Sequence, residues 1–179
     1  MLGKWSKWYK DISVNNPKLH KYGDTSTYQI AADFLSDMEK IEDWGCGPGR
    51  FRKFYNGKYI GVDGTKNIFV DKVKDLRKYK SNTDGIIMRH VLEHNYDWEK
   101  ILKNAVKSFK KKFCLILFTP FAVTTHQIDF NEKIGVPDIA FKKEDIEKCL
   151  DKCEWEVETI PTNTIYGIEH VYKIWKRSK

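Results

Sequence analysis

Acidic and glycine residues whose spacing suits a ligand-binding turn occur together in residues 43–51, DWGCGPGRF. Residues 41–44 are predicted to form a short strand, and residues 48–55 a short helix. Glycine has no Cβ, so it adopts positive φ and lets a ligand lie against the backbone. The first N–H groups of a helix are unpaired and can bind such a ligand. The residues that this pattern assigns to a binding loop are Asp43, Gly45, Cys46, Gly47, Gly49, Arg50 and Phe51.

A second acidic residue, Asp63, ends the apolar stretch 59–62, 14 residues after Gly49. An acid at the end of the second strand of a nucleotide-binding fold commonly accepts hydrogen bonds from ribose hydroxyls. This holds for any ligand that contains adenosine. We therefore expect Asp63 and the following Gly64 to contact the ribose of such a ligand.

Two later stretches complete a pattern. Residues 84–94, DGIIMRHVLEH, form an apolar strand that runs into Val-Leu-Glu-His. Residues 139–146, IAFKKEDI, precede a helix and then a strand over 155–160. With the loop 43–51 and Asp63, these stretches resemble, in the same order, the motifs of the class I S-adenosylmethionine (SAM) dependent methyltransferases, in particular small single-domain members of the type-11-like group. The resemblance covers residues 40–160.

The resemblance implies an α/β fold: a Rossmann-like, mostly parallel seven-stranded sheet in the order 3-2-1-4-5-7-6, with strand seven antiparallel and helices on both faces. It implies SAM as the cofactor, with S-adenosylhomocysteine (SAH) as the product. Asp43 would serve the methionine amine of SAM. Asp75 and Leu76 would flank its adenine. Arg89 and His90, which follow the fourth strand, would lie beside its methionine part.

Two histidines are candidate catalytic residues. His94 ends the VLEH stretch, and His126 lies beside Gln127 and Asp129 in the segment 119–140. Imidazole titrates near neutral pH, so either ring can serve as a general base if the acceptor must lose a proton. The alternatives are that His94 caps the next helix and that His126 is an exposed loop residue.

Aromatic residues are frequent near the beginning of the sequence, among them Trp5, Trp8 and Tyr9. They fit a lid over the ligand or a platform on which a planar substrate stacks. The alternative is that they serve packing, which is the more common use of aromatic side chains. The substrate or lid contacts that we favour, because they precede or open the helix leading to the binding loop, are Tyr22, Thr25 and Tyr28.

Strands and helices are predicted to alternate around these residues, as in an α/β domain. Helices are predicted over 25–40, 98–109 and 142–152, and the lysines at 107 and 110–112 suit the negative end of the second. Beyond those already named, strands are predicted over 85–89, 113–118 and 164–175. Only 12 residues separate Asp63 from Asp75, so a short third strand within 67–74 replaces the usual helix.

The length of 179 residues fits one domain. Since 41% of the residues are hydrophobic, this domain can bury a sizeable core. We expect a single methyltransferase domain over 1–179, with an N-terminal cap and helix (1–40), a SAM-binding core (41–179) and a substrate-side insert (119–140). No apolar run is long enough to span a membrane, and residues 1–8 lack the apolar region of a secretory signal. The four cysteines lack metal-ligand spacing, so we expect reduced thiols, no metal and a cytoplasmic location.

The net charge of +7 and pI of about 9.1 leave nucleic acid open as a partner. We expect methyl transfer to an O or N acceptor on a small molecule or nucleotide-like substrate. The alternatives are an RNA- or DNA-directed methyltransferase that uses the lysine-rich surface, and a non-catalytic partner subunit with the same fold. The stretch after the fourth strand lacks the [DN]-P-P-[YFW] sequence of exocyclic-amine methylation and the Pro-Cys nucleophile of cytosine-C5 methylation. Oligomeric state and the identity of the acceptor stay open.

Overall fold

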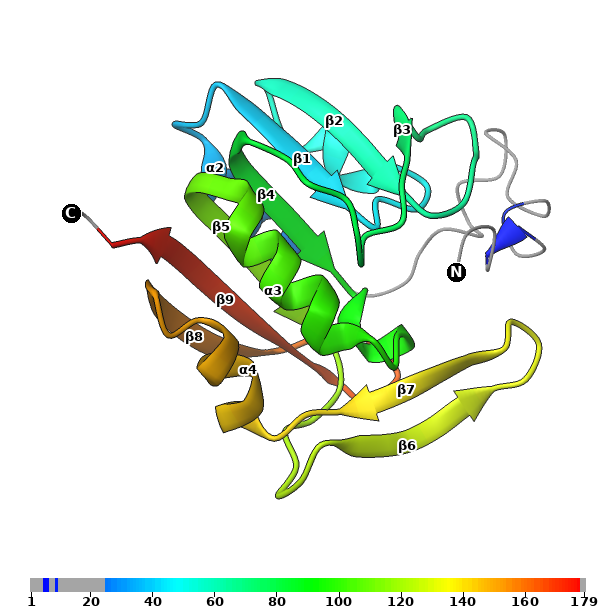
Figure 1. Ribbon diagram of the computed structural model, residues 1–179. Helices are drawn as coiled ribbons and strands as arrows, with labels where there is room; N and C mark the ends of the chain where they lie inside the picture. The colour runs from blue at the N-terminus through cyan, green and yellow to red at the C-terminus, as the bar shows by residue number, and fades with distance from the viewer. Residues whose placement is uncertain (1–4, 7–8, 10–24, 178–179) are drawn as a thin grey trace.

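A seven-stranded sheet forms the centre of the computed structural model, which describes residues 5, 6, 9 and 25–177 (Figure 1). The strands follow the order β3-β2-β1-β4-β5-β9-β8. The first five strands in this order, from β3 through β2, β1 and β4 to β5, pair in parallel. Strand β9 lies between β5 and β8 and is antiparallel to both. The predicted sheet order and the antiparallel last strand are therefore confirmed. The strand bounds are β1 Lys40–Trp44, β2 Lys58–Asp63, β3 Lys72–Val73, β4 Thr83–Arg89, β5 Phe109–Leu117, β8 Cys153–Pro161 and β9 Ile168–Lys176.

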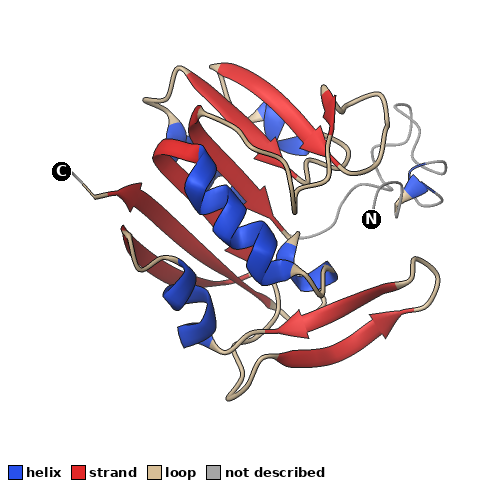
Figure 2. Ribbon diagram, in the orientation of Figure 1, coloured by secondary structure: helices blue, strands red, loops and turns tan. Residues whose placement is uncertain are grey.

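Helices cover both faces of the sheet, as predicted (Figure 2). Helices α3 (Trp98–Ser108) and α4 (Lys143–Cys149) pack over one face, where their apolar residues join the larger core. Helix α2 (Ser26–Leu35) packs on the other face over a second core that contains Phe51 and Ile116. Between these layers, residues 113–117 of β5 are entirely buried, which is typical of a central parallel strand.

Several predicted boundaries were wrong. Lysines 110–112 lie in β5 rather than at the end of α3, because Phe109 and Phe113 are both buried in the core, and a register shift in the pairing with β4 leaves Lys110 and Lys111 between them exposed. Helix α2 ends at Leu35, five residues before the predicted end, and Lys40 already belongs to β1. Helix α4 ends at Cys149, so that the buried Cys153 can open β8.

The helix predicted over 48–55 is only a single 3₁₀ turn, η2 (Arg50–Lys53), which begins after Gly49. The crossover from β2 to β4 is as short as predicted, and β3 contains just two residues. The shortened crossover leaves the sheet edge beside β2 without a helix among residues 64–82.

Segment 119–140, predicted only as an insert, contains a β-hairpin of β6 (His126–Asn131) and β7 (Val136–Ala140). Figure 1 shows the hairpin projecting from the lower edge of the molecule, beyond the carboxyl ends of the parallel strands. All of β7 is buried, whereas all of β6 is exposed, and β7 packs against the 3₁₀ turn η3 (Leu92–His94). The hairpin therefore borders the edge of the sheet at which β4 ends.

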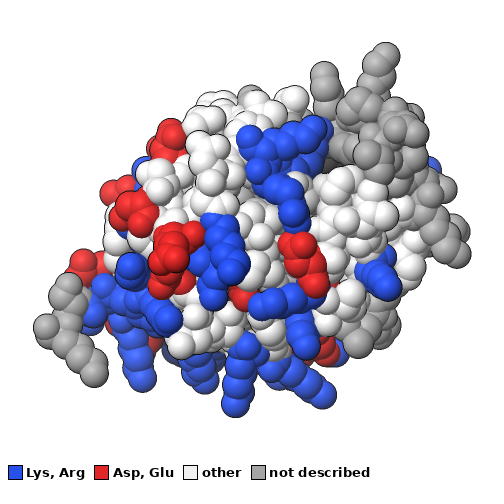
Figure 3. Space-filling view, turned by 90° about the horizontal axis from the view of Figure 1, so that it is seen from above, with Lys and Arg blue, Asp and Glu red and all other residues white. Residues whose placement is uncertain are grey.

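Charged side chains of both signs share the surface seen from above, and basic ones dominate its lower edge (Figure 3). Several lysines and arginines are paired with acids, among them Lys72 with Glu42 and Lys112 with Asp37. The four cysteines are buried and free, as expected. Within residues 25–177, no helix is long and apolar enough to cross a membrane, and no cluster of His, Cys, Asp and Glu could hold a metal ion.

Candidate active site

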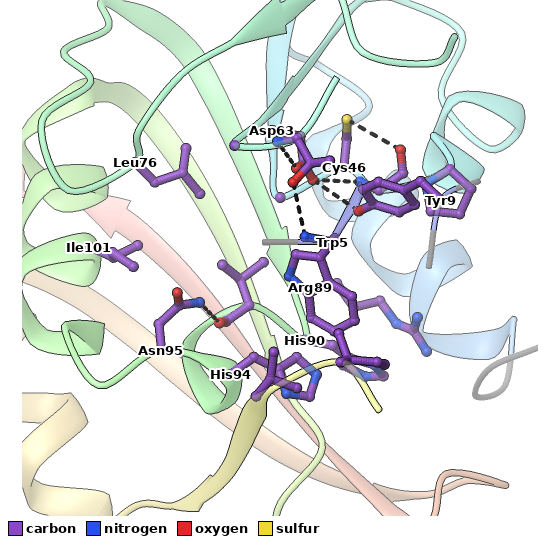
Figure 4. Close-up of a pocket in the computed structure, with 18 of the residues that line it drawn as sticks. Trp5, Tyr9, Cys46, Asp63, Leu76, Arg89, His90, His94, Asn95 and Ile101 are labelled. Carbon is purple, nitrogen blue, oxygen red and sulfur yellow. Dashed lines mark hydrogen bonds between the residues drawn. The ribbon is translucent and has the colours of Figure 1, made fainter. Parts of the chain in front are cut away.

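A cavity of about 560 Å³ lies at the carboxyl ends of β1, β2 and β4 (Figure 4). In α/β folds ligands bind outside this edge of the sheet. Figure 4 shows Leu76 and Ile101 on one side of the cavity, Tyr9 on the other and His94 below. The predicted site residues that line it are Tyr28, Gly45, Cys46, Gly47, Arg50, Asp63, Gly64, Asp75, Leu76, Arg89, His90 and His94.

The glycine loop has the backbone that its sequence predicts. Gly45, Gly47 and Gly49 all have positive φ, at 79°, 49° and 64°. At Gly45, a Cβ would lie 2.3 Å from Cγ2 of Val91, so the loop packs against the stretch after β4 too closely for any side chain. The Gly45 and Cys46 N–H groups donate to the Val62 carbonyl, which holds the loop across the end of β2.

Asp63 joins this loop to the end of β2. Its Oδ2 accepts hydrogen bonds from the Gly47 N–H (3.1 Å) and the Tyr9 hydroxyl (3.3 Å), and its Oδ1 accepts one from the Thr65 N–H (2.8 Å). Burial raises the pKa of Asp63, although the backbone donors of Thr65 and Gly47 oppose the rise. The carboxylate therefore lies where the sequence placed it, at the cavity wall beside the glycine loop.

Asp43 lies beneath the loop rather than at the cavity surface. Its Oδ2 accepts a hydrogen bond from the Tyr59 hydroxyl at 2.6 Å, and burial raises its pKa to about 7. Gly49 and Phe51 also lie outside the cavity lining. Gly49 precedes the first residue of η2, and Phe51 is packed in the core under α2. These three predicted residues shape the loop from behind.

The side of the cavity opposite Tyr9 is apolar, and its residues Leu76 and Ile101 are nearly buried. Asp75, beside Leu76, does not present a free carboxylate. Both of its oxygens accept from the Arg77 guanidinium at 2.6–3.2 Å, and this pairing lowers the pKa of Asp75 to about 2. Arg77 was expected only as part of the basic surface in the nucleic-acid alternative, and its pairing with Asp75 was not predicted.

Beyond β4, the buried Glu169 of β9 binds both Arg89 and His90. Glu169 Oε1 lies 2.8 Å from Arg89 Nη2 and 2.6 Å from His90 Nε2. Burial and the charge of Arg89 hold the pKa of His90 well below its usual range, so this imidazole is neutral. His90 has a φ of +56°, uncommon outside glycine, which turns the chain toward the cavity. The Arg89 guanidinium also lies 4.3 Å above the Tyr28 ring.

The two candidate catalytic histidines are placed differently. His94 lines the cavity, and its Nδ1 lies 3.1 Å from Asp138 Oδ1 and 3.0 Å from the Pro137 carbonyl oxygen. His126 is exposed on β6, away from the cavity lining, and its Nδ1 lies 2.7 Å from the Thr124 carbonyl oxygen. The geometry supports His94 and gives His126 no contact with the cavity.

Among the predicted lid residues, Tyr28 lines the cavity, Thr25 is an exposed residue at the start of α2, and Tyr22 lies outside the described residues. Trp5 and Tyr9 reach the cavity instead. The Trp5 N–H donates to Thr65 Oγ1 at 3.2 Å, and the Trp5 ring meets His94 edge-on, with centroids 5.2 Å apart. These two rings cover the cavity beside Asp63.

Sequence reasoning missed several residues at or beside the cavity. Glu169 and Asp138 are isolated acidic residues in strands with many buried residues. A single acid in an apolar strand can be recognised in the sequence, because a buried charge needs a partner. The others come from elements whose structure was not predicted in detail. The cavity-lining residues that were not predicted individually as cofactor or substrate contacts are Thr65, Lys74, Arg77, Val91, Asn95, Ile101, Asp129, Asn131, Ile134, Val136, Asp138 and Ile165.

The chain is similar to known proteins in its structure and not in its sequence. No family model and no curated protein matches the sequence. Among solved structures, 1,6-didemethyltoxoflavin-N1-methyltransferase of Burkholderia thailandensis, with SAH and 1,6-didemethyltoxoflavin bound, superposes with a TM-score of 0.68 at 12% identity, covering 86% of this chain and 77% of that one.

Two further methyltransferases with bound SAH match almost end to end. Magnesium protoporphyrin IX methyltransferase of Synechocystis PCC 6803 has a TM-score of 0.60 at 16% identity, covering 97% of this chain and 93% of its own. The N-methyltransferase NodS of Bradyrhizobium japonicum WM9 has a TM-score of 0.63 at 10% identity, covering 98% and 100%. The chain therefore has the Rossmann-like fold of the class I SAM-dependent methyltransferases, as the sequence motifs predicted.

Proposed function

We propose that the protein is a SAM-dependent methyltransferase that acts on an O or N acceptor of a small molecule or nucleotide-like compound. The observation that carries this proposal is the joint placement of the glycine loop and Asp63 at one wall of a single cavity, linked by the hydrogen bond from the Gly47 N–H to Asp63 Oδ2. The methyltransferase fold supports it, because the compared structures with this fold contain SAH.

The chemistry of the cavity wall fits the parts of SAM. The loop offers bare backbone at Gly45 and Gly47, and Asp63 offers a carboxylate to ribose hydroxyls. Leu76, Val91 and Ile101 form an apolar surface suited to adenine. A volume of about 560 Å³ lies within the common range for ligand pockets and leaves room for an acceptor.

SAM, when bound, supplies an activated methyl group on a sulfonium. The work left to the protein is to align the acceptor with that methyl group and keep water away. Trp5 and Tyr9 cover the nucleoside side of the cavity, and Tyr28 with Arg89 closes the side toward α2. Arg50 lines the cavity near these residues and has no ion pair within the described part of the chain, so it is suited to a carboxylate of the donor or an anionic group of the acceptor.

The hairpin forms the acceptor side of the proposed site. It contributes polar and apolar lining residues together, including Asn131, Ile134 and Val136. The cavity volume of about 560 Å³ suits a small acceptor beside the cofactor. The basic lower edge in Figure 3 supports the alternative of a nucleic-acid substrate, which the experiment must test.

The test begins with calorimetric titration of the folded protein with SAM and SAH. Micromolar binding of both is expected, and absence of binding would refute the donor site. Methyl transfer is then measured with labelled SAM and pools of small molecules, in parallel with RNA and DNA at low and high salt. Incorporation into a small molecule supports the proposal, and salt-sensitive incorporation into nucleic acid supports the alternative. SAH binding without turnover on any acceptor supports the non-catalytic subunit.

A further inference from the structure

His94 is held by a chain of hydrogen bonds that starts outside the glycine-loop site. Tyr166, in the turn before β9, donates its hydroxyl hydrogen to Asp138 Oδ2 at 3.0 Å. The other oxygen of Asp138 lies 3.1 Å from Nδ1 of His94, which is also 3.0 Å from the carbonyl oxygen of Pro137. The Asp138 carboxylate oxygen and the Pro137 carbonyl oxygen are acceptors, so the Nδ1 that lies between them carries a proton. In the neutral ring the lone pair is then on Nε2.

The hairpin is what brings this carboxylate to the cavity. Asp138 lies in β7, and β7 packs directly on η3, which contains His94. Asp138 is itself almost buried, and burial alone would raise its pKa, but the hydrogen bonds from His94 and Tyr166 outweigh burial and lower it. A buried carboxylate with two donors is a fixed element of the site, and it holds the imidazole in one orientation.

The second histidine at the cavity is less suited to accept a proton. The His90 ring is bonded to Glu169, whose charge is shared with Arg89, and burial and the Arg89 charge lower the pKa of His90. The side chain of His94 is 16% exposed, twice the value for His90. His94 is therefore the better-placed base of the two.

We propose that Asp138, braced by Tyr166, is a positioning residue that holds His94 as the general base of the methyl transfer, and that the acceptor atom is consequently one that must lose a proton, such as a hydroxyl oxygen. The inference rests on the proposed methyltransferase function. It narrows the acceptor class from any O or N nucleophile to a group that is protonated at neutral pH.

The step balances with the groups already named. The acceptor O–H bond breaks, and its proton moves to Nε2 of His94. The acceptor oxygen forms a bond to the methyl carbon as the bond from that carbon to the sulfonium sulfur breaks, which leaves a methyl ether and SAH, whose sulfur is uncharged. The imidazolium, stabilised by Asp138, then releases its proton to solvent. The other titratable groups around His94 are its neighbour Glu93 and the neutral His90.

The first measurement needs neither donor nor acceptor. Nitrogen-15 NMR of histidine-labelled protein, with His94→Gln for assignment, reports which ring nitrogen carries the proton. The expected result is a proton on Nδ1 in the uncharged form of the His94 ring. In Asp138→Asn, the amide can donate to Nδ1, so the proton should move to Nε2, as happens in a serine-protease triad when its aspartate is replaced by asparagine. A wild-type His94 protonated on Nε2 would overturn the proposal.

The second measurement compares kinetics on an acceptor found by the labelled-SAM screen. In Asp138→Asn, kcat should fall at least tenfold with KM little changed, and the deficit should shrink as pH rises and the acceptor ionises by itself. SAH affinity should stay at the wild-type value. Glu132→Gln, which removes an exposed carboxylate from the hairpin turn outside the cavity lining, is the matched control and should retain full activity.

The outcomes separate the two claims. If wild-type protein does not bind SAH, the proposed function is refuted. The NMR experiment shows independently which ring nitrogen of His94 carries the proton. Wild-type turnover by Asp138→Asn across pH 6–9, or methyl transfer only to an uncharged amine, refutes the base. A large loss of methyl-transfer activity in His90→Gln, with no loss in His94→Gln, would show that His90 and not His94 accepts the proton.

Discussion

Replacement of Gly45 by alanine tests whether the glycine loop is fixed by its contact with the stretch after β4. The new Cβ would lie 2.3 Å from Cγ2 and 3.3 Å from Cγ1 of Val91, at a φ of +79°. The left-handed backbone costs an alanine about 1 kcal/mol. The overpacking adds about 1–3 kcal/mol, because Val91 can retreat only by moving the backbone that follows β4.

The chain offers a control that separates these two costs. Gly167 has a nearly identical φ of +73°, and a Cβ there would meet nothing within 4 Å. We expect Gly167→Ala to lower the free energy of unfolding by about 1 kcal/mol, from backbone strain alone. Gly45→Ala should lower it by about 2–4 kcal/mol, the sum of strain and overpacking.

The clash should also be relieved by its partner. Val91→Ala removes both methyl groups that the new Cβ would meet, so the double variant Gly45→Ala, Val91→Ala should be about 1 kcal/mol more stable than the sum of the single changes predicts. Urea denaturation followed by circular dichroism measures the free energy of unfolding of the wild type and of the four variants. Equal losses for Gly45→Ala and Gly167→Ala, or strict additivity with Val91→Ala, would refute the close packing of the loop.

Three further changes test the site. Tyr9→Phe removes a donor from Asp63 Oδ2, an oxygen that ribose hydroxyls would use, so calorimetry should show SAH binding about two- to fivefold tighter; weaker binding would mean that the hydroxyl helps to hold the ligand. Arg50→Met should weaken SAH about tenfold and leave 5′-methylthioadenosine, which lacks the amino-acid part, unaffected, whereas equal losses for both would exclude a carboxylate contact with the donor. The pKa of buried Glu93 is raised to about 7, so the folded protein binds more protons than the unfolded chain between pH 4.5 and 7, and stability falls as pH rises through that window. Glu93→Gln keeps an acceptor for the Phe118 N–H and should remove about 2–3 kcal/mol of the stability loss between pH 5 and 8 in urea melts; an unchanged pH dependence would contradict the raised pKa.

The fold was predictable because its signals are local and periodic. The apolar run that ends at Leu117 and the glycine-rich stretch around Gly47 each constrain one element through burial or backbone geometry. The short crossover after Asp63 could be predicted from chain length alone, since 12 residues cannot hold a helix and its two connections. Boundaries such as the start of β5 at Phe109 depend on which residues reach the core, which periodicity does not specify.

The cofactor side of the site was predictable to the same degree, and the acceptor side was not. Asp63 and Gly47 are close in sequence to the turns that place them, whereas Glu169 reaches Arg89 across 80 residues and Asp138 reaches His94 across 44. Such contacts depend on the pairing of β5 with β9 and on the hairpin, which no local pattern in residues 119–140 indicated. His126 was chosen because it is a histidine in the segment that follows the fifth strand, but the structure places it on the exposed strand β6, away from the cavity lining.

Calorimetric titration of SAH into wild-type protein and Asp63→Asn tests the account most directly, with Asp84→Asn, at the opposite end of the sheet in β4, as the control. The carboxylate of Asp63 should contribute about 1.5–3 kcal/mol through charge-assisted hydrogen bonds to the ribose, which is at least a tenfold change in affinity. The account predicts micromolar binding by the wild type and the control, and binding at least tenfold weaker by Asp63→Asn. Equal affinity in all three folded proteins, or no binding by any, would contradict it.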